Sequence, residues 1–302
     1  MTQHLALTLV ANHTAHPSIR NIADAAHRAL RTADFHCTAP DWLADDHACD
    51  IMIEATDIRA VRDLIDGSSF LVETDYCLQP ATGRKKKLFL ADMDSTIITV
   101  ECIDELADFA GLRAEVSAIT EKAMNGELEF NAAFRARVAM LKGLHHDVLQ
   151  QVFDERVTLT AGARALVQTM RAQGTYTALV SGGFTFFTNR VREQVGFHMD
   201  MSNELQFEKE VLTGIAAEPI LNSAAKLDTL ERLMREQAIA REETLAIGDG
   251  ANDIPMIEAA GLGVAFHAKP KATAAADATI RFGDLTALLY YQGYRKSDII
   301  DL

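Results

Sequence analysis

Three segments of the chain read as buried strands, and each of them ends in small or acidic residues. They are LFLAD, YTALVSGG and TLAIGDG, of which the first runs into DMDST and the last into GDGAND. A nearly continuous apolar run is typical of a strand in a parallel sheet, because helices cover both faces of such a sheet. Ligands bind at the carboxyl ends of these strands. The sequence therefore predicts that the three polar clusters meet at one site.

Strand and helix patterns alternate from Leu88 onward, with one long helical segment among them. That segment runs from Glu101 to about Val157 and directly follows the first strand. Alternating strands and helices are typical of a doubly wound α/β sheet. We therefore expect a Rossmann-like α/β domain over residues 88–302, with a helical cap inserted at about 101–157.

The first 80 residues are patterned differently. HLALTLVA, CDIMIEA and FLVETDYCL read as strands, and PSIRNIADAAHRALR and DIRAVRDLID read as amphipathic helices. A βαββαβ order predicts an α+β ferredoxin-like domain over residues 1–80, similar to the ACT-type modules of some enzymes of amino-acid metabolism. No residue in it is identified as a ligand contact, so a scaffold or homodimer surface is as plausible as an effector site.

Residues 81–87 are interpreted as a linker, because Pro80, Gly83 and a basic run separate the two patterns. We interpret Lys85 to Lys87 as a solvated connector. His13 and His16 have no second ligand pair at metal-site spacing, and we interpret them as surface or capping residues.

Charge and cysteine usage limit the classes of partner. The formal net charge is −14, and the first 80 residues carry 12 acidic against 5 basic residues. Such a surface repels phosphate backbones and anionic lipid, so we expect no nucleic-acid and no membrane partner. The sequence has neither a long apolar run nor a secretory signal. Its 4 scattered cysteines fit free thiols. These features favour a cytoplasmic protein with a small-molecule substrate.

The acidic residues at the strand ends indicate a divalent metal and a phosphoryl group. Asp92 and Asp249 are suited to Mg²⁺, which prefers oxygen ligands together with phosphate and water. Asp253 is either a third ligand or an acceptor for a metal-bound water. A carboxylate can also attack phosphorus. We therefore expect Asp92 to act as the nucleophile, and Asp94 to act first as the proton donor and then as the base that activates water.

The other residues of the clusters suit phosphate binding. Ser181 and Gly182 offer a hydroxyl and backbone N–H groups ahead of a helix. Lys226 is expected in the first turn of a helix, where a cation opposes the helix dipole, which suggests that a nearby anion needs it. Asn252 can hydrogen-bond to neighbouring oxygens without adding charge.

These motifs resemble an established family. DMDST, SGGF, a lysine about 45 residues later and GDGAND are similar, in order and spacing, to the motifs of the haloacid dehalogenase (HAD) superfamily of phosphohydrolases. DMDSTIITVECIDELA, AMNGELEFNAAFRARVAMLKGL and GDGANDIPMIEAAGLGVAFHAKP resemble more closely the phosphoserine phosphatase family within it. The resemblance extends from about Leu88 to Ala276. It implies Mg²⁺-dependent hydrolysis of O-phosphoserine through an aspartyl-phosphate.

The resemblance also implies roles for individual residues. Asp92 matches the nucleophile and Asp94 the general acid and base. The family's Mg²⁺ is held by the Asp92 carboxylate, the Asp94 backbone carbonyl and Asp249. The matched phosphate-binding residues are Ser181, Gly182 and Lys226, and those that close the site are Asn252 and Asp253.

In the cap, Glu101 matches the contact to the substrate ammonium, Arg137 the contact to its carboxylate, and Phe130 a hydrophobic lid. Arginine is suited to two-point recognition of a carboxylate. From the residues alone, Glu101 could instead lie in a helix first turn, Arg137 could pair with Glu129 on the cap surface, and Phe130 could be cap core.

Two other functions remain open at this stage. One is a phosphatase or phosphotransferase for another small phosphomonoester, such as phosphothreonine or phosphohomoserine. The other is a non-catalytic amino-acid-sensing protein that works through its N-terminal domain. The intact acidic motifs argue against the second.

Overall fold

The structure is a computed structural model of the 302-residue chain, and it describes residues 2–12 and 18–300. His13 and His16 lie outside the described residues, so their predicted role stays a prediction.

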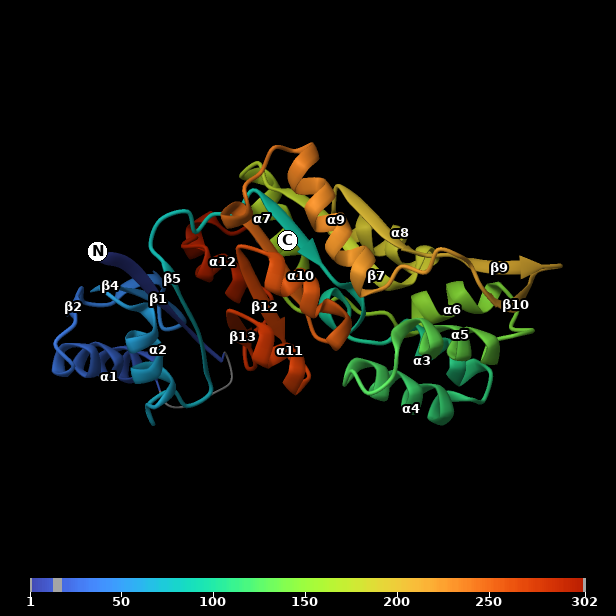
Figure 1. The fold of residues 1–302 in the computed structure, drawn as a ribbon, viewed down its shortest axis with the longest axis horizontal. Helices are drawn as coiled ribbons and strands as arrows, with labels where there is room; N and C mark the ends of the chain where they lie inside the picture. The colour runs from blue at the N-terminus through green and yellow to red at the C-terminus, as the bar shows by residue number, and fades with distance from the viewer. Residues whose placement is uncertain (1, 13–17, 301–302) are drawn as a thin grey trace.

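Residues after 87 form a parallel sheet with helices on both faces (Figure 1). The strand order β13-β12-β11-β6-β7-β8 comprises β6 (Leu88–Ala91), β7 (Tyr176–Phe184), β8 (Met199–Asn203), β11 (Thr244–Gly248), β12 (Leu262–Phe266) and β13 (Ala278–Ile280). Its helices are α7 (Ala163–Ala172), α8 (Thr185–Val195), α9 (Ser223–Glu236), α10 (Ile254–Ala259), α11 (Pro270–Ala275) and α12 (Ala287–Tyr291). This is the expected Rossmann-like α/β fold.

Alternating side chains explain why both faces of β6 are buried. Leu88 and Leu90 pack in one cluster with Leu230 of α9, whereas Phe89 and Ala91 pack in a second cluster that includes α7 and α8. The side chains of the central strand β6 are therefore all apolar. The first polar side chain is that of Asp92, which directly follows the strand.

A segment of four helices lies between β6 and α7, and we call it the insert. It contains α3 (Cys102–Phe109), α4 (Arg113–Met124), α5 (Phe130–Met140) and α6 (Asp147–Arg156). The β9–β10 hairpin (Leu205–Glu208, Val211–Ala216) reaches over it at the end of the molecule opposite the N-terminal part (Figure 1).

The N-terminal part contains β1 (Gln3–Ala11), α1 (Ile19–Thr32), β2 (His36–Cys37), β3 (Asp41–Ala44), β4 (Ala48–Ala55), α2 (Ile58–Asp66) and β5 (Thr74–Pro80). Its antiparallel order β2-β4-β1-β5, with β3 also on β4, places the first strand centrally. α1 begins at the cap Ser18 and buries Ile22, Ala26 and Leu30 at helical spacing. The predicted closing strand starts late, at Thr74, because Glu73 has a positive φ of 47° that interrupts extended backbone.

The two parts share one sheet, since Tyr76 of β5 pairs with Thr279 of β13. Lys85 and Lys87 of the joining segment are exposed, as expected for a solvated connector, but that interpretation is wrong for Lys86. Lys86 is buried, and its Nζ donates to the carbonyl of Glu242 at 2.7 Å. Lys85 Nζ lies 4.4 Å from the ring centroid of Tyr294. A basic run in a sequence does not reveal carbonyls and rings that accept its ammonium groups.

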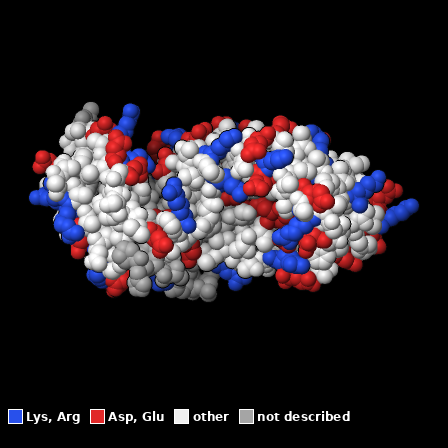
Figure 2. All heavy atoms as spheres, turned by 90° about the horizontal axis from the view of Figure 1, so that it is seen from below, with Lys and Arg blue, Asp and Glu red and all other residues white. Residues whose placement is uncertain are grey.

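On the face drawn in Figure 2, basic and acidic side chains are interspersed, and no extended basic patch is visible. Over the residues that the structure describes, no helix is long and apolar enough to cross a membrane.

Candidate active site

A small pocket lies at the carboxyl ends of β6 and β7, beneath the insert. Its volume is about 50 Å³, which holds only a few water molecules. Seven of the residues predicted from the sequence line it: Asp92, Asp94, Glu101, Phe130, Arg137, Gly182 and Asn252. The other four, Ser181, Lys226, Asp249 and Asp253, are buried beside it.

Asp92 lies at the floor of the pocket, directly after β6. Its Oδ1 accepts a hydrogen bond from the backbone N–H of Met93 at 2.7 Å and lies 2.8 Å from Nζ of Lys226. Both bonds fall on Oδ1, so among the described residues Oδ2 is the oxygen available to a ligand. Burial and the neighbouring Asp253 raise the pKa of Asp92 to about 8, although Lys226 opposes this.

Lys226 connects two of the acids. It lies in the first turn of α9 with 0% of its surface exposed, and its Nζ donates to Oδ1 of Asp253 at 2.6 Å. Burial alone would lower its pKa, but the carboxylates of Asp253 and Asp92 outweigh burial and raise it. The ammonium is therefore charged, and it offsets part of the acidic cluster.

Asp249 and Asp253 follow β11 and differ in how they are engaged. Both oxygens of Asp253 are occupied, because Oδ2 also accepts the backbone N–H groups of Asp249 at 3.2 Å and Gly250 at 3.1 Å. By contrast, Oδ1 of Asp249 is buried without a hydrogen-bond partner in the described structure. A buried oxygen of this kind is costly unless a ligand satisfies it.

These acids fit a divalent cation. Ligand atoms of Asp92, Asp249 and Asp253 lie within 4.8 Å of one another. Burial, together with the charge of Glu101 and Asp253, raises the pKa of Asp249 well above its ordinary value. A cation would relieve this repulsion and satisfy the unpartnered oxygen. Asp92 and Asp249 are the free donors, whereas Asp253 is held by Lys226 and the backbone.

Asp94 is held from two sides. Its Oδ1 accepts the backbone N–H of Cys102 at 2.9 Å, and its Oδ2 accepts the hydroxyl of Ser181 at 3.1 Å. Burial raises its pKa above the ordinary value, against the effect of these hydrogen bonds. A raised pKa favours the protonated carboxyl, which is the form that a general acid needs.

The two glycines after Ser181 allow close approach on both sides. A Cβ at Gly182 would lie 2.8 Å from Cζ of Phe130, and one at Gly183 would lie 2.6 Å from Oδ2 of Asp94. The Phe130 ring therefore lies directly against the end of β7, where the sequence predicted a turn. Phe130 also stacks on Phe134, with ring centroids 6.0 Å apart, so it is both a pocket wall and part of the packing of the insert.

Glu101 precedes α3 but does not cap it with its side chain. Instead, its Oε1 accepts the hydroxyl of Ser95 at 2.6 Å. Ser95 has a φ of 53°, a strained conformation that directs the chain toward the insert. Burial and the charge of Asp94 raise the pKa of Glu101 to about 8. Glu101 thus stands at the start of α3, next to the first turn that the alternative names, and its side chain lines the pocket.

Arg137 is buried and faces the pocket from α5. Its Nη1 donates to the hydroxyl of Thr120 at 3.1 Å, and its Nε donates to the carbonyl of Ala133 at 3.3 Å. The alternative pairing with Glu129 is wrong, because Glu129 caps α5 by accepting N–H groups of that helix. Arg137 has no carboxylate within ion-pair distance in the described structure.

Ser95 and Thr120 support the site but were not predicted from the sequence. A hydroxyl that supports a charged residue has no sequence signal, because its partner is defined only by packing.

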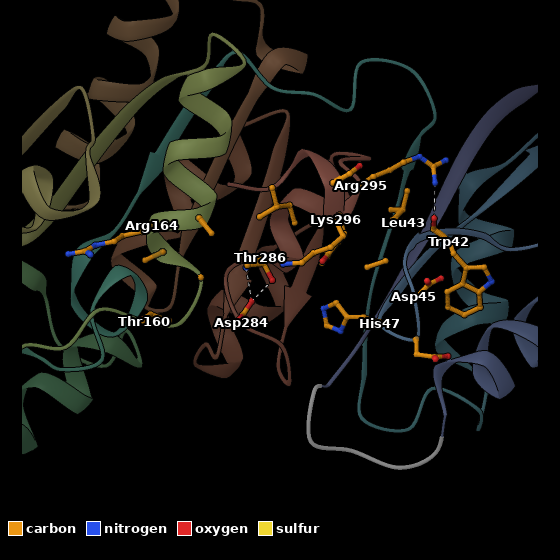
Figure 3. A pocket seen from close by; sticks show the side chains of 18 of the residues that line it. Trp42, Leu43, Asp45, His47, Thr160, Arg164, Asp284, Thr286, Arg295 and Lys296 are labelled. Atoms are coloured by element: carbon orange, nitrogen blue, oxygen red, sulfur yellow. Dashed lines mark hydrogen bonds between the residues drawn. The ribbon is translucent and has the colours of Figure 1, made fainter. Parts of the chain in front are cut away.

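A larger cavity, of about 1000 Å³, lies between the β3–β4 turn and the start of α7 (Figure 3). Its walls carry charges of both signs, including Asp45, Arg164 and Lys296. None of the predicted site residues lines it. The smaller pocket is the candidate active site because its acids and its two glycines, with the unpartnered oxygen of Asp249 buried beside it, together suit a defined chemistry.

Comparison with known proteins agrees with this geometry. Residues 89–258 match the model of the haloacid dehalogenase-like hydrolase family. The phosphoserine phosphatase of Haemophilus influenzae is 46% identical over 202 residues, which are 67% of this chain and 64% of that protein. The chain thus spans slightly less than two thirds of that relative.

Two solved structures extend the comparison. A HAD family hydrolase from Salmonella enterica serovar Typhi is 31% identical, with a TM-score of 0.79 over 95% of this chain and 98% of its own. A structure described as a phospho-aspartyl intermediate analogue of phosphoserine phosphatase is 40% identical, with a TM-score of 0.66 over 68% of this chain and 99% of its own. The chain belongs to the haloacid dehalogenase-like hydrolases and, within them, to the phosphoserine phosphatase family.

Proposed function

We propose that this protein hydrolyses O-phospho-L-serine to L-serine and phosphate, with Mg²⁺, through an aspartyl-phosphate. The observation that carries the proposal is that one pocket combines the acids Asp92 and Asp94 with a third carboxyl group, Glu101, and a cation, Arg137. An amino-acid phosphate presents three charged groups, and the pocket offers a complementary group for each.

In the proposed first step, one oxygen of the Asp92 carboxylate attacks phosphorus and forms an aspartyl-phosphate bond. The bond from phosphorus to the serine oxygen breaks, and Asp94 gives that oxygen its proton. The raised pKa of Asp94 supports this donation.

In the second step, Asp94 removes a proton from water, and the resulting oxygen attacks phosphorus. The Asp92–phosphorus bond breaks, which releases phosphate and regenerates the carboxylate. The related structure described as a phospho-aspartyl intermediate analogue supports an intermediate of this kind.

Asp92, Asp249 and the backbone carbonyl of Asp94 would hold Mg²⁺. When bound, the ion supplies charge stabilisation for the transferring phosphoryl group. Asp253 would fix Lys226 and the backbone after β11 rather than bind the ion, because both of its oxygens are already occupied.

The phosphate would be bound by Ser181, the backbone N–H of Gly182 and the ammonium of Lys226. Glu101 would accept from the substrate ammonium, and Arg137 would pair with its carboxylate. Asn252 would contact the substrate from the side of β11, and Phe130 would close the pocket.

The insert would act as a cap. A volume of about 50 Å³ is too small for phosphoserine, so the insert must move away for the substrate to reach Asp92. Closure would exclude bulk water during phosphoryl transfer.

The N-terminal part would form an ACT-like domain over residues 1–80, with residues 81–87 joining it to the phosphatase domain. Its strand order, with β1 between β4 and β5, supports this proposal. A cytoplasmic location and a homodimer remain predictions.

Phosphate release from a panel of phosphorylated metabolites tests the function. We expect turnover of phosphoserine with Mg²⁺ and none with a chelator. Preference for phosphothreonine or phosphohomoserine, or transfer to added alcohol, would favour a related phosphatase or phosphotransferase. Asp92→Asn should abolish turnover in a folded protein. If none of the compounds releases phosphate in a Mg²⁺-dependent reaction, a non-catalytic amino-acid-sensing protein becomes the better hypothesis.

A further inference from the structure

Two adjacent histidines, an aspartate and a glutamate converge where the insert meets the β9–β10 hairpin. His145 and His146 precede α6, Asp147 is its first residue, and Glu210 lies in the hairpin turn. Nδ1 of His145 is 3.3 Å from Oδ2 of Asp147, and Nδ1 of His146 is 2.8 Å from Oδ1 of Asp147. We propose that His145, His146 and Asp147 bind a Zn²⁺ ion, separate from the Mg²⁺ site.

The spacing of the donors fits such an ion. One ligand atom from each of these three residues lies within 4.8 Å of the others. Two ligands that are each about 2.0–2.1 Å from a tetrahedral zinc lie about 3.3 Å apart. The distances from Asp147 to Nδ1 of His145 and of His146, 3.3 Å and 2.8 Å, are close to that value. Small side-chain rotations would therefore bring the three donors to tetrahedral positions around the ion.

Glu210 supplies the contact that orients a ligating imidazole. The backbone N–H of Asp147 donates to Nδ1 of His145 at 3.3 Å, which leaves the ring proton on Nε2. Nε2 lies 3.6 Å from Oε2 of Glu210. A metal-binding histidine usually donates its other N–H to a carboxylate, and a small rotation of either side chain would bring this pair into hydrogen-bond range. The ion would bind to Nδ1 of His145 and displace the 3.3 Å hydrogen bond that this atom accepts from the backbone N–H of Asp147.

The donor types select the ion. Imidazole nitrogens favour zinc and its neighbours in the transition series, whereas Mg²⁺ requires an octahedron of oxygens. His145 and His146 are 45% and 47% exposed, so an ion can bind from solvent and water can complete its coordination.

The ion would fasten the insert to the hairpin. Backbone bonds already pair the two segments: Gly143 N–H donates to the carbonyl of Leu212 at 2.8 Å, and His146 N–H donates to that of Glu210 at 2.8 Å. The hairpin connects β8 to α9, the helix that carries Lys226. A zinc ion at this junction would therefore hold the insert to the chain that leads to the pocket.

Equilibrium dialysis with ZnCl₂, in saturating Mg²⁺ to occupy the acidic pocket, tests the proposal. We expect one zinc per wild-type chain and none at this site in His145→Ala/His146→Ala. Glu210→Gln should raise the dissociation constant about tenfold, the effect typical of losing an orienting carboxylate. Zinc should also slow hydrogen exchange at the amides of Gly143 and His146 in the wild type only.

His4→Asn/His36→Asn is the matched control, because those histidines also flank a carboxylate, Glu54, at 3.9 Å and 3.4 Å. The control should keep the zinc. Equal zinc loss in the control, retention in His145→Ala/His146→Ala, or no binding by the wild type would each overturn the proposal. Mg²⁺-dependent phosphatase activity should be unchanged in both variants, which separates this test from that of the catalytic site.

Discussion

Nζ of Lys226 lies 2.8 Å from Oδ1 of Asp92, so a fully buried ammonium holds one oxygen of the proposed nucleophile. The same ammonium donates to Asp253 at 2.6 Å. Lys226 therefore does two things in this geometry. It orients Asp92 so that the other oxygen is available, and it balances the acids when no cation is bound.

Lys226→Met should reduce kcat for phosphoserine at least about 100-fold, since loss of one charged group aimed at a phosphoryl transition state has that scale. It should also lower the melting temperature in chelator, because Asp92 and Asp253 lose their buried partner. Mg²⁺ should restore part of that loss. Lys122→Met, on the exposed end of α4, is the control and should behave as wild type. Full activity in Lys226→Met would contradict the assignment.

Thr120 is predicted to position Arg137 without touching the substrate. Its hydroxyl accepts from Arg137 at 3.1 Å and donates to Oδ1 of Asp104 at 2.7 Å. Thr120→Val should raise KM for phosphoserine about tenfold, because that factor corresponds to the free energy of one lost hydrogen bond to a charged group. The change in kcat should be less than about twofold. KM for an aryl phosphate without a carboxylate should not change.

Ser117→Ala provides the matched control for Thr120. Ser117 donates to the other oxygen of Asp104 at 2.6 Å but has no contact with Arg137. If both variants raise KM equally, the effect comes from Asp104 and α4 packing, and Thr120 has no separate positioning role.

The strand-end residues were predictable from sequence because their placement follows from topology. Asp92 and Asp249 each stand just beyond a buried parallel strand, and Ser181 lies in the last part of a third, β7. Such strands end at one edge of the sheet. Thr120 and Ser95 were not predictable, since a hydroxyl gains its role only from the charged group that packs against it. The burial of Lys86 was missed for the same reason. Its acceptor, the carbonyl of Glu242, is a backbone group about 150 residues away.

Glu101 predicts a specific dependence of stability on pH in the absence of metal and substrate. Its pKa of about 8 in the folded chain exceeds the ordinary value of 4.5. Between these two values the folded state keeps a proton that the unfolded state has released. Unfolding therefore releases that proton, and the free energy of unfolding falls as pH rises through this window.

Glu101→Gln should remove this contribution. Relative to wild type, the variant should gain about 3–4 kcal/mol between about pH 5 and pH 8, because each pH unit in which only the folded state keeps the proton is worth about 1.4 kcal/mol. Urea unfolding in chelator measures the difference. Glu129→Gln should show the opposite trend, because backbone N–H groups lower the pKa of Glu129 and its stabilisation is lost as pH falls. A pH-independent difference for Glu101→Gln would contradict the raised pKa.

Arg84 and Asp50 predict how firmly the N-terminal part is joined to the rest. Nη1 and Nη2 of Arg84 donate to the two oxygens of Asp50 at 2.6 Å and 3.0 Å, and Nε donates to the carbonyl of Tyr291 at 3.1 Å. Both side chains are buried. The guanidinium of Arg84, in the joining segment, therefore connects β4, which contains Asp50, to the C-terminal helix α12, which contains Tyr291.

Arg84→Met should destabilise the chain by about 3–5 kcal/mol, because it leaves the Asp50 carboxylate buried without its partner. Arg84→Met/Asp50→Leu should be less destabilised than the sum of the two single variants, since the double variant leaves no buried charge unpaired. Urea unfolding of the four proteins gives the coupling energy. Arg20→Met, which removes an exposed pair with Asp46, should cost less than about 1 kcal/mol. Additive single effects at Arg84 and Asp50 would show that this ion pair does not couple the two parts.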